Sequence, residues 1–304
     1  MKKYIPLYLA LALAPAGASA QIIVNDSFSD GDRGNTGPLQ AAWWSSTSAG
    51  NNSVEAGVGY LGLATGTSGR GLHGTFAPQT LGVGDTLTAT FTFRTPTTVG
   101  TTDGGFRFSL GDLNNGGLAA DLDTGSSVTQ PLFQNLPAYM VDFDVNKADA
   151  SDDVNVRKHN ASDPTGRFMG TTTVWTTINS GPDANYAFTA NTEYVAVVSL
   201  TRTGADSMDI FGSLSQNNVL LASHTATDAS GIANHFGLAG VWVNSNVFGS
   251  SSALDTADNG IDFSNIKIEY FAVVPEPSVL ALSAAALASL GFFRNRKYGQ
   301  VSRL

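Results

Sequence analysis

The chain has 304 residues, no cysteine, 33 glycines and only 13% charged residues. The absence of cysteine excludes a disulfide framework and a thiolate metal site, so the hydrophobic core must carry the stability of the folded part. Residues 21–272 hold 10 Lys and Arg against 24 Asp and Glu, a net charge of −14. This acidic balance argues against nucleic acid as a partner.

The N-terminus has the three parts of a secretory signal peptide. Lys2 and Lys3 precede an apolar region over 5–14, and small residues follow at Ala18 and Ala20. This order predicts export and cleavage after Ala20. A retained membrane anchor is the alternative, and the short apolar region with its clear cleavage site argues against it.

The body of the chain is rich in short strand patterns. The clearest lies at 86–94, where Leu, Ala and two Phe alternate with four Thr, an alternation that a helix would scatter around its circumference. The region around Trp43 and Trp44 has little periodicity and is expected to be a loop. Further strands are expected at 22–28, 54–63 (a weak pair), 106–110, 139–145, 154–156, 168–178, 194–200, 208–211, 236–243 and 261–271.

Three of these segments carry more specific expectations. The apolar runs 194–200 and 236–243 are nearly continuous, which is typical of central strands covered on both faces. In 261–271 the apolar residues change from odd to even positions, which predicts a β-bulge near Ser264 and Asn265.

Ten or more short strands without a helical period between them predict an all-β, antiparallel sandwich. A closed barrel or a β-helix is the alternative, although no fixed repeat period supports a solenoid. The expected organisation is a signal peptide at 1–20, a β-sandwich domain at 21–272 and a separate C-terminal segment at 273–304.

The C-terminal segment combines a proline motif, a short apolar run and a basic cluster. Pro275, Glu276 and Pro277 come first, and both prolines push the preceding residue toward extended geometry. The uncharged run 279–293 follows; as a helix it would reach about 22 Å, short of the roughly 30 Å hydrocarbon core of a bilayer. The basic cluster consists of Arg294, Arg296 and Lys297.

This order of motif, apolar helix and basic cluster resembles the PEP-CTERM sorting signal of Gram-negative bacteria. The resemblance implies that an exosortase, a membrane peptidase, processes the tail after transient anchoring in the inner membrane. The protein would then reach the cell surface or the extracellular matrix. The chain departs from the pattern by continuing for seven residues after Lys297, and an ordinary C-terminal anchor helix is the alternative.

The strand sequence of the body also resembles the concanavalin-A-like, or laminin-G-like, jelly-roll sandwiches found ahead of such tails. The similar segments are "TLTATFTFRT", "GGFRFSLGD", "AYMVDFDV", "YVAVVSLTRTGADSMDIFGSL" and "IDFSNIKIEYF". The resemblance is one of strand order rather than of diagnostic residues. It implies a lectin-like jelly roll with a short transmembrane-like helix behind it.

Catalytic patterns are weak in this sequence. Asp142 and Asp144 share a strand face, but the glutamates expected of a laminarinase-type active strand are absent, so two solvated aspartates are the preferred interpretation. The segment 66–70 lacks the final glycine of a nucleophile elbow. The four histidines show no metal-motif spacing and are expected as isolated residues in loops.

No cofactor is required by these patterns, although the residues allow a structural calcium ion. The loop 112–123 begins like a calcium loop but lacks the long Glu at its twelfth position. A second candidate site would tie the first strand to the last through Asp26 or Asp30 together with Asp262.

Sugar binding would use aromatic rings that stack on the apolar faces of pyranoses. The aromatic residues outside the strongly alternating strands are Trp43, Trp44, Trp175 and Tyr186; the alternative is that each plugs an end of the core. The sequence therefore favours an exported, non-enzymatic surface or matrix protein with polysaccharide as the hypothetical ligand. The alternative is a polysaccharide-cleaving enzyme, either a glycoside hydrolase or a lyase.

Overall fold

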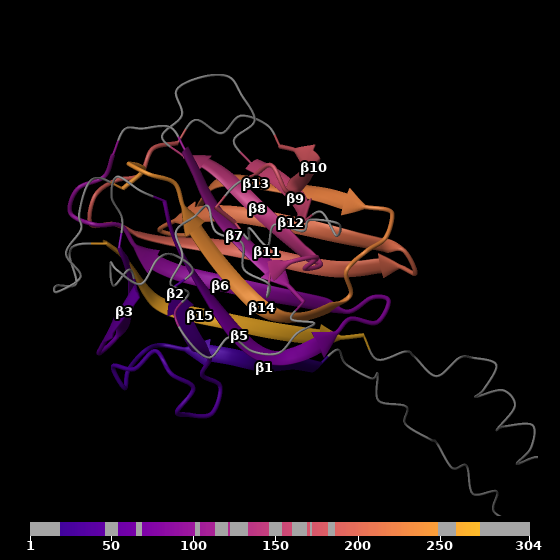
Figure 1. The fold of residues 1–304 in the computed structure, drawn as a ribbon, viewed down its shortest axis with the longest axis horizontal. Helices are drawn as coiled ribbons and strands as arrows, with labels where there is room; N and C mark the ends of the chain where they lie inside the picture. The colour runs from indigo at the N-terminus through magenta and orange to yellow at the C-terminus, as the bar shows by residue number, and fades with distance from the viewer. Residues whose placement is uncertain are drawn as a thin grey trace, which may run out of the picture. The chain divides into compact units, whose positions relative to one another are not determined.

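The computed structural model describes residues 19–45, 54–64, 69–100, 104–112, 121, 133–145, 154–159, 169–170, 172–181, 186–248 and 260–273. Residues Ala20–Ala272 form one compact unit, and its described part consists of strands, turns and irregular segments (Figure 1). Within those residues no helix is long and apolar enough to cross a membrane.

The strands form two sheets, which we call sheet A and sheet B. Sheet A has the order β13-β12-β11-β6-β15-β4-β3, with β1 also paired to β15. Its strands are β1 (Ser19–Asp26), β3 (Val54–Gly57), β4 (Tyr60–Ala64), β6 (Thr86–Arg94), β11 (Glu193–Gly204), β12 (Ser207–Gln216), β13 (Val219–Asp228) and β15 (Gly260–Ala272).

Sheet B has the order β10-β9-β8-β7-β14-β5-β2. Its strands are β2 (Ala42–Ser45), β5 (Arg70–Thr80), β7 (Gly104–Gly111), β8 (Ala138–Val145), β9 (Val154–His159), β10 (Trp175–Ser180) and β14 (His235–Val243). Apart from β1, whose partner is β15, neighbouring strands pair antiparallel in both sheets. The expectation of an all-β antiparallel sandwich is therefore confirmed.

An aromatic core fills the space between the sheets. Phe91 and Phe93 on β6 face Phe106 and Phe108 on β7, with ring centroids 5.0–6.3 Å apart, and all four are 0% exposed. Burying one such side chain contributes roughly 1.5–3 kcal/mol. This core supplies the stability that disulfides give to many exported domains.

Sheet B is covered on its other face as well. A second apolar cluster lies there, built from β8 and β14 residues and from side chains of the intervening segments. Its members are Phe133, Leu136, Ala138, Met140, Met169, Val174, Trp175, Leu238 and Trp242, with Trp44 packed against them. The outer face of sheet A mixes polar side chains with the partly exposed Val195, Val197 and Phe211. On this face Thr86 and Thr201 are hydrogen-bonded at 2.9 Å.

Several strand predictions are confirmed. The alternating segment 86–94 is β6, with every second residue buried. The run 236–243 lies in β14, which is buried on both faces. The register of β15 shifts between Phe263 and Asn265. A bulge is predicted at this place because the apolar residues change there from odd to even positions.

Other predictions are wrong. The run 194–200 lies in β11, whose residues are alternately buried and half-exposed, because no layer of described residues covers the outer face of sheet A. The segment around Trp43 forms β2 rather than a loop. Sequence patterns miss β5 and β13: β5 is buried on both faces over much of its length, and β13 is built largely from small and polar residues.

Candidate functional site

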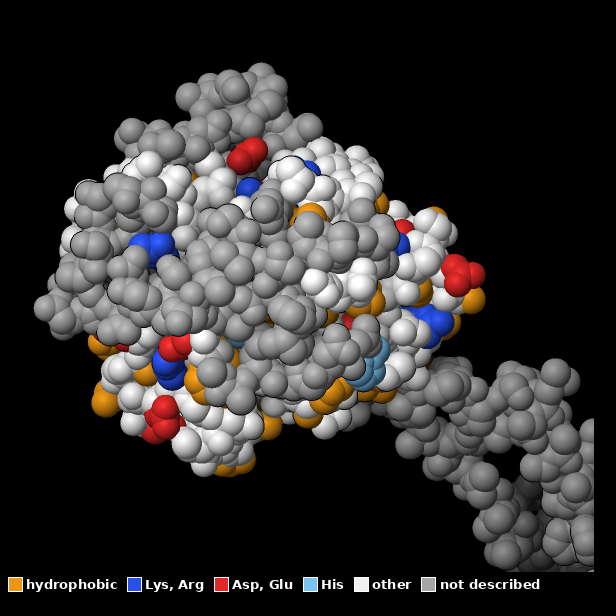
Figure 2. Space-filling model, in the orientation of Figure 1, with side chains coloured by type: hydrophobic (Ala, Val, Ile, Leu, Met, Phe, Trp, Pro, Cys, Tyr) orange, Lys and Arg blue, Asp and Glu red, His pale blue; other side chains and the backbone are white. Residues whose placement is uncertain are grey.

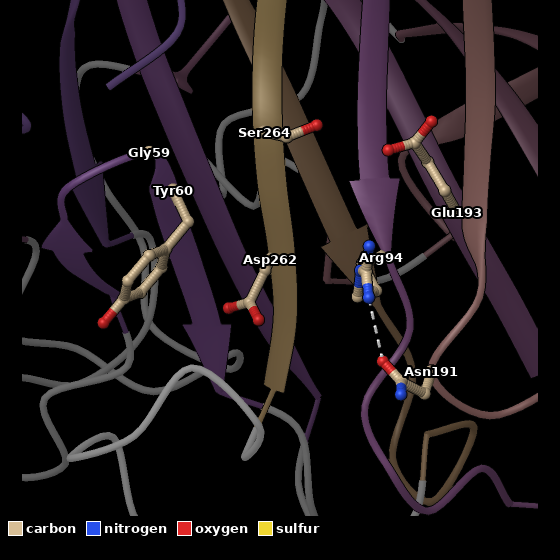
Figure 3. A pocket seen from close by; sticks show the side chains of 7 residues that line it. All are labelled: Gly59, Tyr60, Arg94, Asn191, Glu193, Asp262 and Ser264. Atoms are coloured by element: carbon tan, nitrogen blue, oxygen red, sulfur yellow. Dashed lines mark hydrogen bonds between the residues drawn. The ribbon is translucent and has the colours of Figure 1, made fainter. Parts of the chain in front are cut away.

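A polar pocket of about 310 Å³ opens at one end of sheet A. Register places three charged side chains of its lining in one row across neighbouring strands, because Arg94 on β6 lies between Glu193 on β11 and Asp262 on β15. Gly59, Tyr60, Asn191 and Ser264 complete the lining. Figure 3 shows the Tyr60, Asp262, Arg94 and Glu193 side chains following one another across the site.

Local backbone features present these groups. The two-residue turn Val58–Gly59 joins β3 to β4 with Gly59 at φ 86°, a conformation that favours glycine. The Tyr60 ring packs on the backbone of Gly57, where any Cβ would collide with it. On the other side, the β15 bulge leaves both Asp262 and Ser264 partly exposed at the pocket.

The charged groups of the pocket are positioned by a glycine beneath two carboxylates and by a hydrogen bond to the arginine. A Cβ added at Gly62 would lie 3.1 Å from Glu55 Oε1 and 3.5 Å from Asp262 Oδ1, so the two carboxylates converge above this residue. Burial raises the pKa of Tyr60, and the charges of Glu55 and Asp262 raise it further, so the phenol keeps its proton. The Arg94 guanidinium donates a 3.2 Å hydrogen bond to Asn191 Oδ1.

The lining suits recognition of hydroxyl groups. Carboxylates accept hydrogen bonds, guanidinium donates them, and amide and hydroxyl side chains do both. The Tyr60 ring adds an apolar surface with a polar tip. The volume is at the small end of the roughly 300–1,000 Å³ typical of small-molecule sites, so the pocket fits a group of the size of one sugar ring.

The aromatic residues singled out from the sequence lie elsewhere, and three of the four are buried. Trp43 is 0% exposed in the main core, Trp175 lies in the second cluster, and Tyr186 packs beside Phe188. These three rings lie in the core, as the alternative interpretation predicts. A buried ring is not placed to stack on a sugar. Trp44 is partly exposed, with the Arg33 guanidinium 5.6 Å from its ring centroid.

The expected calcium ligands do not form one site. Asp26 is buried and accepts hydrogen bonds from the Phe28 amide and from Trp43 Nε1. Asp30 accepts hydrogen bonds from Gln40 and from the Asp32 amide. Asp262 instead lines the pocket. Across the described residues, no three His, Asp or Glu side chains are grouped to hold a metal ion.

The interpretation of Asp142 as a solvated carboxylate is wrong. Its side chain is 6% exposed and forms ion pairs with Arg107 Nε at 3.1 Å and Arg157 Nε at 3.6 Å. Burial raises its pKa, while the two guanidinium groups oppose that change. The histidines also differ from expectation, because His73, His159, His224 and His235 all lie in strands.

The sorting and cleavage residues are largely outside the described part of the chain. Ala20 lies at the start of β1 and is exposed. Ala18 and the whole tail motif, comprising Pro275, Glu276, Pro277, Arg294, Arg296 and Lys297, fall outside the described residues.

Sequence patterns miss Tyr60, Arg94, Asn191 and Glu193 as pocket residues. The available signals are slight: Arg94 ends the polar face of an alternating strand, and Glu193 is one of only four glutamates in the chain. The strand order β11-β6-β15, which brings these residues to Asp262, is not contained in local periodicity.

Similarity to known proteins is confined to solved structures. No protein-family model and no curated protein matches the chain. The Ca2+/Man2-bound exoplasmic/lumenal domain of VIP36 aligns with a TM-score of 0.49 at 10% identity, over 84% of this chain and 90% of that domain. The metal-free Emp46p carbohydrate recognition domain gives 0.42 at 13% identity, over 75% and 87%.

Lectin II from Ulex europaeus aligns with a TM-score of 0.43 at 13% identity, over 83% of this chain and 98% of the lectin. All three TM-scores are below 0.5, so the assignment of a two-sheet sandwich rests on the strand pairing itself. The function must be argued from the residues.

Proposed function

We propose that this chain is an exported, non-enzymatic surface or matrix protein whose lectin-like jelly-roll domain binds polysaccharide through the pocket at the end of sheet A. The observation that carries the proposal is the lining itself. Hydrogen-bonding groups from β6, β11 and β15 surround an open space beside the Tyr60 ring. On the face drawn in Figure 2, the visible Lys and Arg side chains lie singly or beside acidic ones.

The pocket makes a direct prediction for glycan binding. We expect Tyr60→Ala to weaken retention on a neutral polysaccharide about tenfold or more, because truncating a central aromatic contact commonly costs over 1 kcal/mol. Glu193→Gln should weaken retention less, because the amide still accepts a hydrogen bond. Affinity electrophoresis of the full chain in gels containing different polysaccharides measures both effects.

A matched control is available on the same face of sheet A. Glu269 lies on β15 and pairs with Lys267 at 2.8 Å, outside the pocket lining. Glu269→Gln should therefore bind as the wild type does. If no polysaccharide retains the wild-type chain, or if Tyr60→Ala is retained equally well, the pocket is not the binding site.

A polysaccharide-cleaving enzyme is the second candidate, because Glu193 and Asp262 line one pocket from strands that flank β6. Glycoside hydrolysis needs two carboxyl groups, one of them kept protonated by apolar surroundings. Glu193 is exposed and Asp262 is beside Arg94 in the register, so neither has such surroundings. Reducing-sugar or unsaturated-product release that Glu193→Gln abolishes would favour the enzyme.

A structural calcium ion is not part of the proposal, because Asp26 and Asp30 are engaged in separate hydrogen bonds.

The sorting role rests on the two terminal segments. We propose that the signal peptide directs export and that an exosortase recognises Pro275-Glu276-Pro277, while the 279–293 helix is anchored briefly in the inner membrane. A helix of about 22 Å suits transient anchoring better than a permanent span. The mature protein would then remain at the surface or in the extracellular matrix.

This sorting role predicts the mass of the mature protein. Intact-mass spectrometry of protein recovered from the cell surface should give a chain that lacks residues 1–20 and the tail 278–304. Replacing both Pro275 and Pro277 by Ala should leave the tail attached, because the extended break before the helix is lost. Wild-type protein that retains residues 278–304 would contradict processing by an exosortase.

A further inference from the structure

Gln21 is the first residue of the mature chain when export cleaves the precursor after Ala20. It lies near the start of β1, and both Ala20 and Gln21 are exposed. Among the described strands β1 pairs with β15 alone, so it forms an edge of sheet A. The processed N-terminus therefore starts on an accessible edge strand rather than inside the sandwich.

The side chain of Gln21 is not held by the fold. Among the described residues, its carboxamide takes part in no hydrogen bond. Asn25, further along the same strand, instead accepts a 3.1 Å hydrogen bond from Asn265 Nδ2. An exposed glutamine without partners can change rotamer and turn back toward its own main-chain nitrogen. The fold thus leaves the Gln21 carboxamide free to reach the α-amino group that cleavage creates.

An N-terminal glutamine carries a nucleophile and an electrophile in one residue. The α-amino nitrogen attacks the side-chain carbonyl carbon Cδ; a new C–N bond forms, the bond from Cδ to Nε2 breaks, and Nε2 leaves as ammonia with a proton given up by the amine. The product is the five-membered lactam pyroglutamate, and no oxidant or other reactant is consumed. α-Amino groups have a pKa of about 7.7–8.0, so part of them is unprotonated near neutral pH. Ring closure is favoured because both reacting groups belong to one residue.

We propose that Gln21 is cyclised to pyroglutamate in the mature protein, an inference that rests on the proposed cleavage after Ala20. The reaction changes only the atoms of Gln21. The lactam keeps one N–H and the main-chain carbonyl of this residue, so β1 loses no main-chain hydrogen-bonding group. The positive charge of the α-amino group disappears, as in other modifications that block a chain terminus.

The modification would protect β1 from trimming. Aminopeptidases need a free α-amino group, and chain termini are where proteolysis concentrates. Val24 and Asp26, which follow Gln21 closely, are each 1% exposed. Asp26 also accepts a 3.2 Å hydrogen bond from Trp43 Nε1 in the core. A blocked N-terminus therefore preserves residues on which the core depends, which suits a protein that remains outside the cell.

Mass spectrometry of protein recovered from the exporting cells tests the proposal. Trypsin should release residues 21–33 as the N-terminal peptide, because Arg33 is the first Lys or Arg after the cleavage site. We expect this peptide to be lighter than its linear form by one ammonia. We also expect the intact protein to resist Edman sequencing until pyroglutamyl aminopeptidase has removed the first residue.

Two controls accompany this measurement. A synthetic linear peptide of residues 21–33, carried through the same digestion, shows how much cyclisation occurs during handling. The variant Gln21→Asn keeps an exposed amide at the same place, but its shorter side chain would have to close a four-membered ring. Its N-terminal peptide should be linear, and the protein should be sequenced directly from residue 21.

The outcomes separate this modification from the export proposal. A mature chain that starts at a linear Gln21, or that is cyclised no further than the synthetic peptide, overturns the modification and leaves export standing. A chain that starts at any other residue overturns both. Loss of ammonia from the Gln21→Asn peptide as well would place the loss at Asn25, which the same peptide contains, and would also overturn the modification.

Discussion

Replacing Asp142 by Ala is expected to lower the free energy of unfolding by about 3–5 kcal/mol. The substitution leaves two guanidinium groups, on Arg107 and Arg157, without their shared carboxylate in the covered layer on sheet B. Uncompensated buried charge is among the most destabilising changes that a single substitution can make. Urea denaturation followed by circular dichroism measures the effect.

The control for this prediction is Asp206→Ala in the turn between β11 and β12. Asp206 is exposed, so its loss should change stability by no more than about 0.5 kcal/mol. A second variant, in which Asp142→Leu is combined with Arg107→Met and Arg157→Met, should recover much of the lost stability, because apolar replacement of a buried ionic group is often neutral or better. A loss below about 1 kcal/mol for Asp142→Ala would show that solvent reaches these arginines.

The sequence predicts which side of β8 faces the main core, but not what covers the other side. Alternation correctly separates Val141 and Phe143 from Asp142. Burial of Asp142 depends on a second layer that includes Phe133 and Met169, which come from distant segments. Only strand pairing shows that Arg107 and Asn155 flank Asp142 in the register. Period-2 patterns identify faces, whereas the solvent exposure of a polar face is decided by tertiary packing.

In the pocket, too, the local sequence pattern predicts some features, whereas others depend on which strands are neighbours in the sheet. The change of phase in β15 predicts the bulge that leaves Asp262 and Ser264 at the pocket. Arg94 and Glu193 join them because β6 lies between β11 and β15, three strands far apart in the chain. Trp43 illustrates the converse case: a large aromatic side chain in an unpatterned segment has no periodic signal to show whether it is buried. Local chemistry is therefore predictable here, and the juxtaposition of distant strands is not.

The stability of the protein is expected to fall in acid because of His73. Complete burial lowers the pKa of its imidazole from 6.5 to about 3, and the nearby charge of Asp121 opposes this shift only in part. Between these values the unfolded chain binds a proton that the native state does not, so stability is lost as the pH falls below 6.5. One pH unit corresponds to about 1.4 kcal/mol, which gives a loss of about 3 kcal/mol by pH 4.

A His73→Leu variant isolates this contribution. Leucine cannot take up a proton, and it removes two unpaired ring nitrogens from a site bordered by Phe133, Trp44 and the Arg33–Asp121 pair. The variant should be at least as stable as the wild type at pH 4, and the stability difference between the two proteins should change by about 3 kcal/mol from pH 7 to pH 4. Carboxylates such as Asp30 titrate in both proteins and cancel in this difference. A difference that is independent of pH would mean that the native state accommodates protonated His73, and that the outer face of sheet B is open to water.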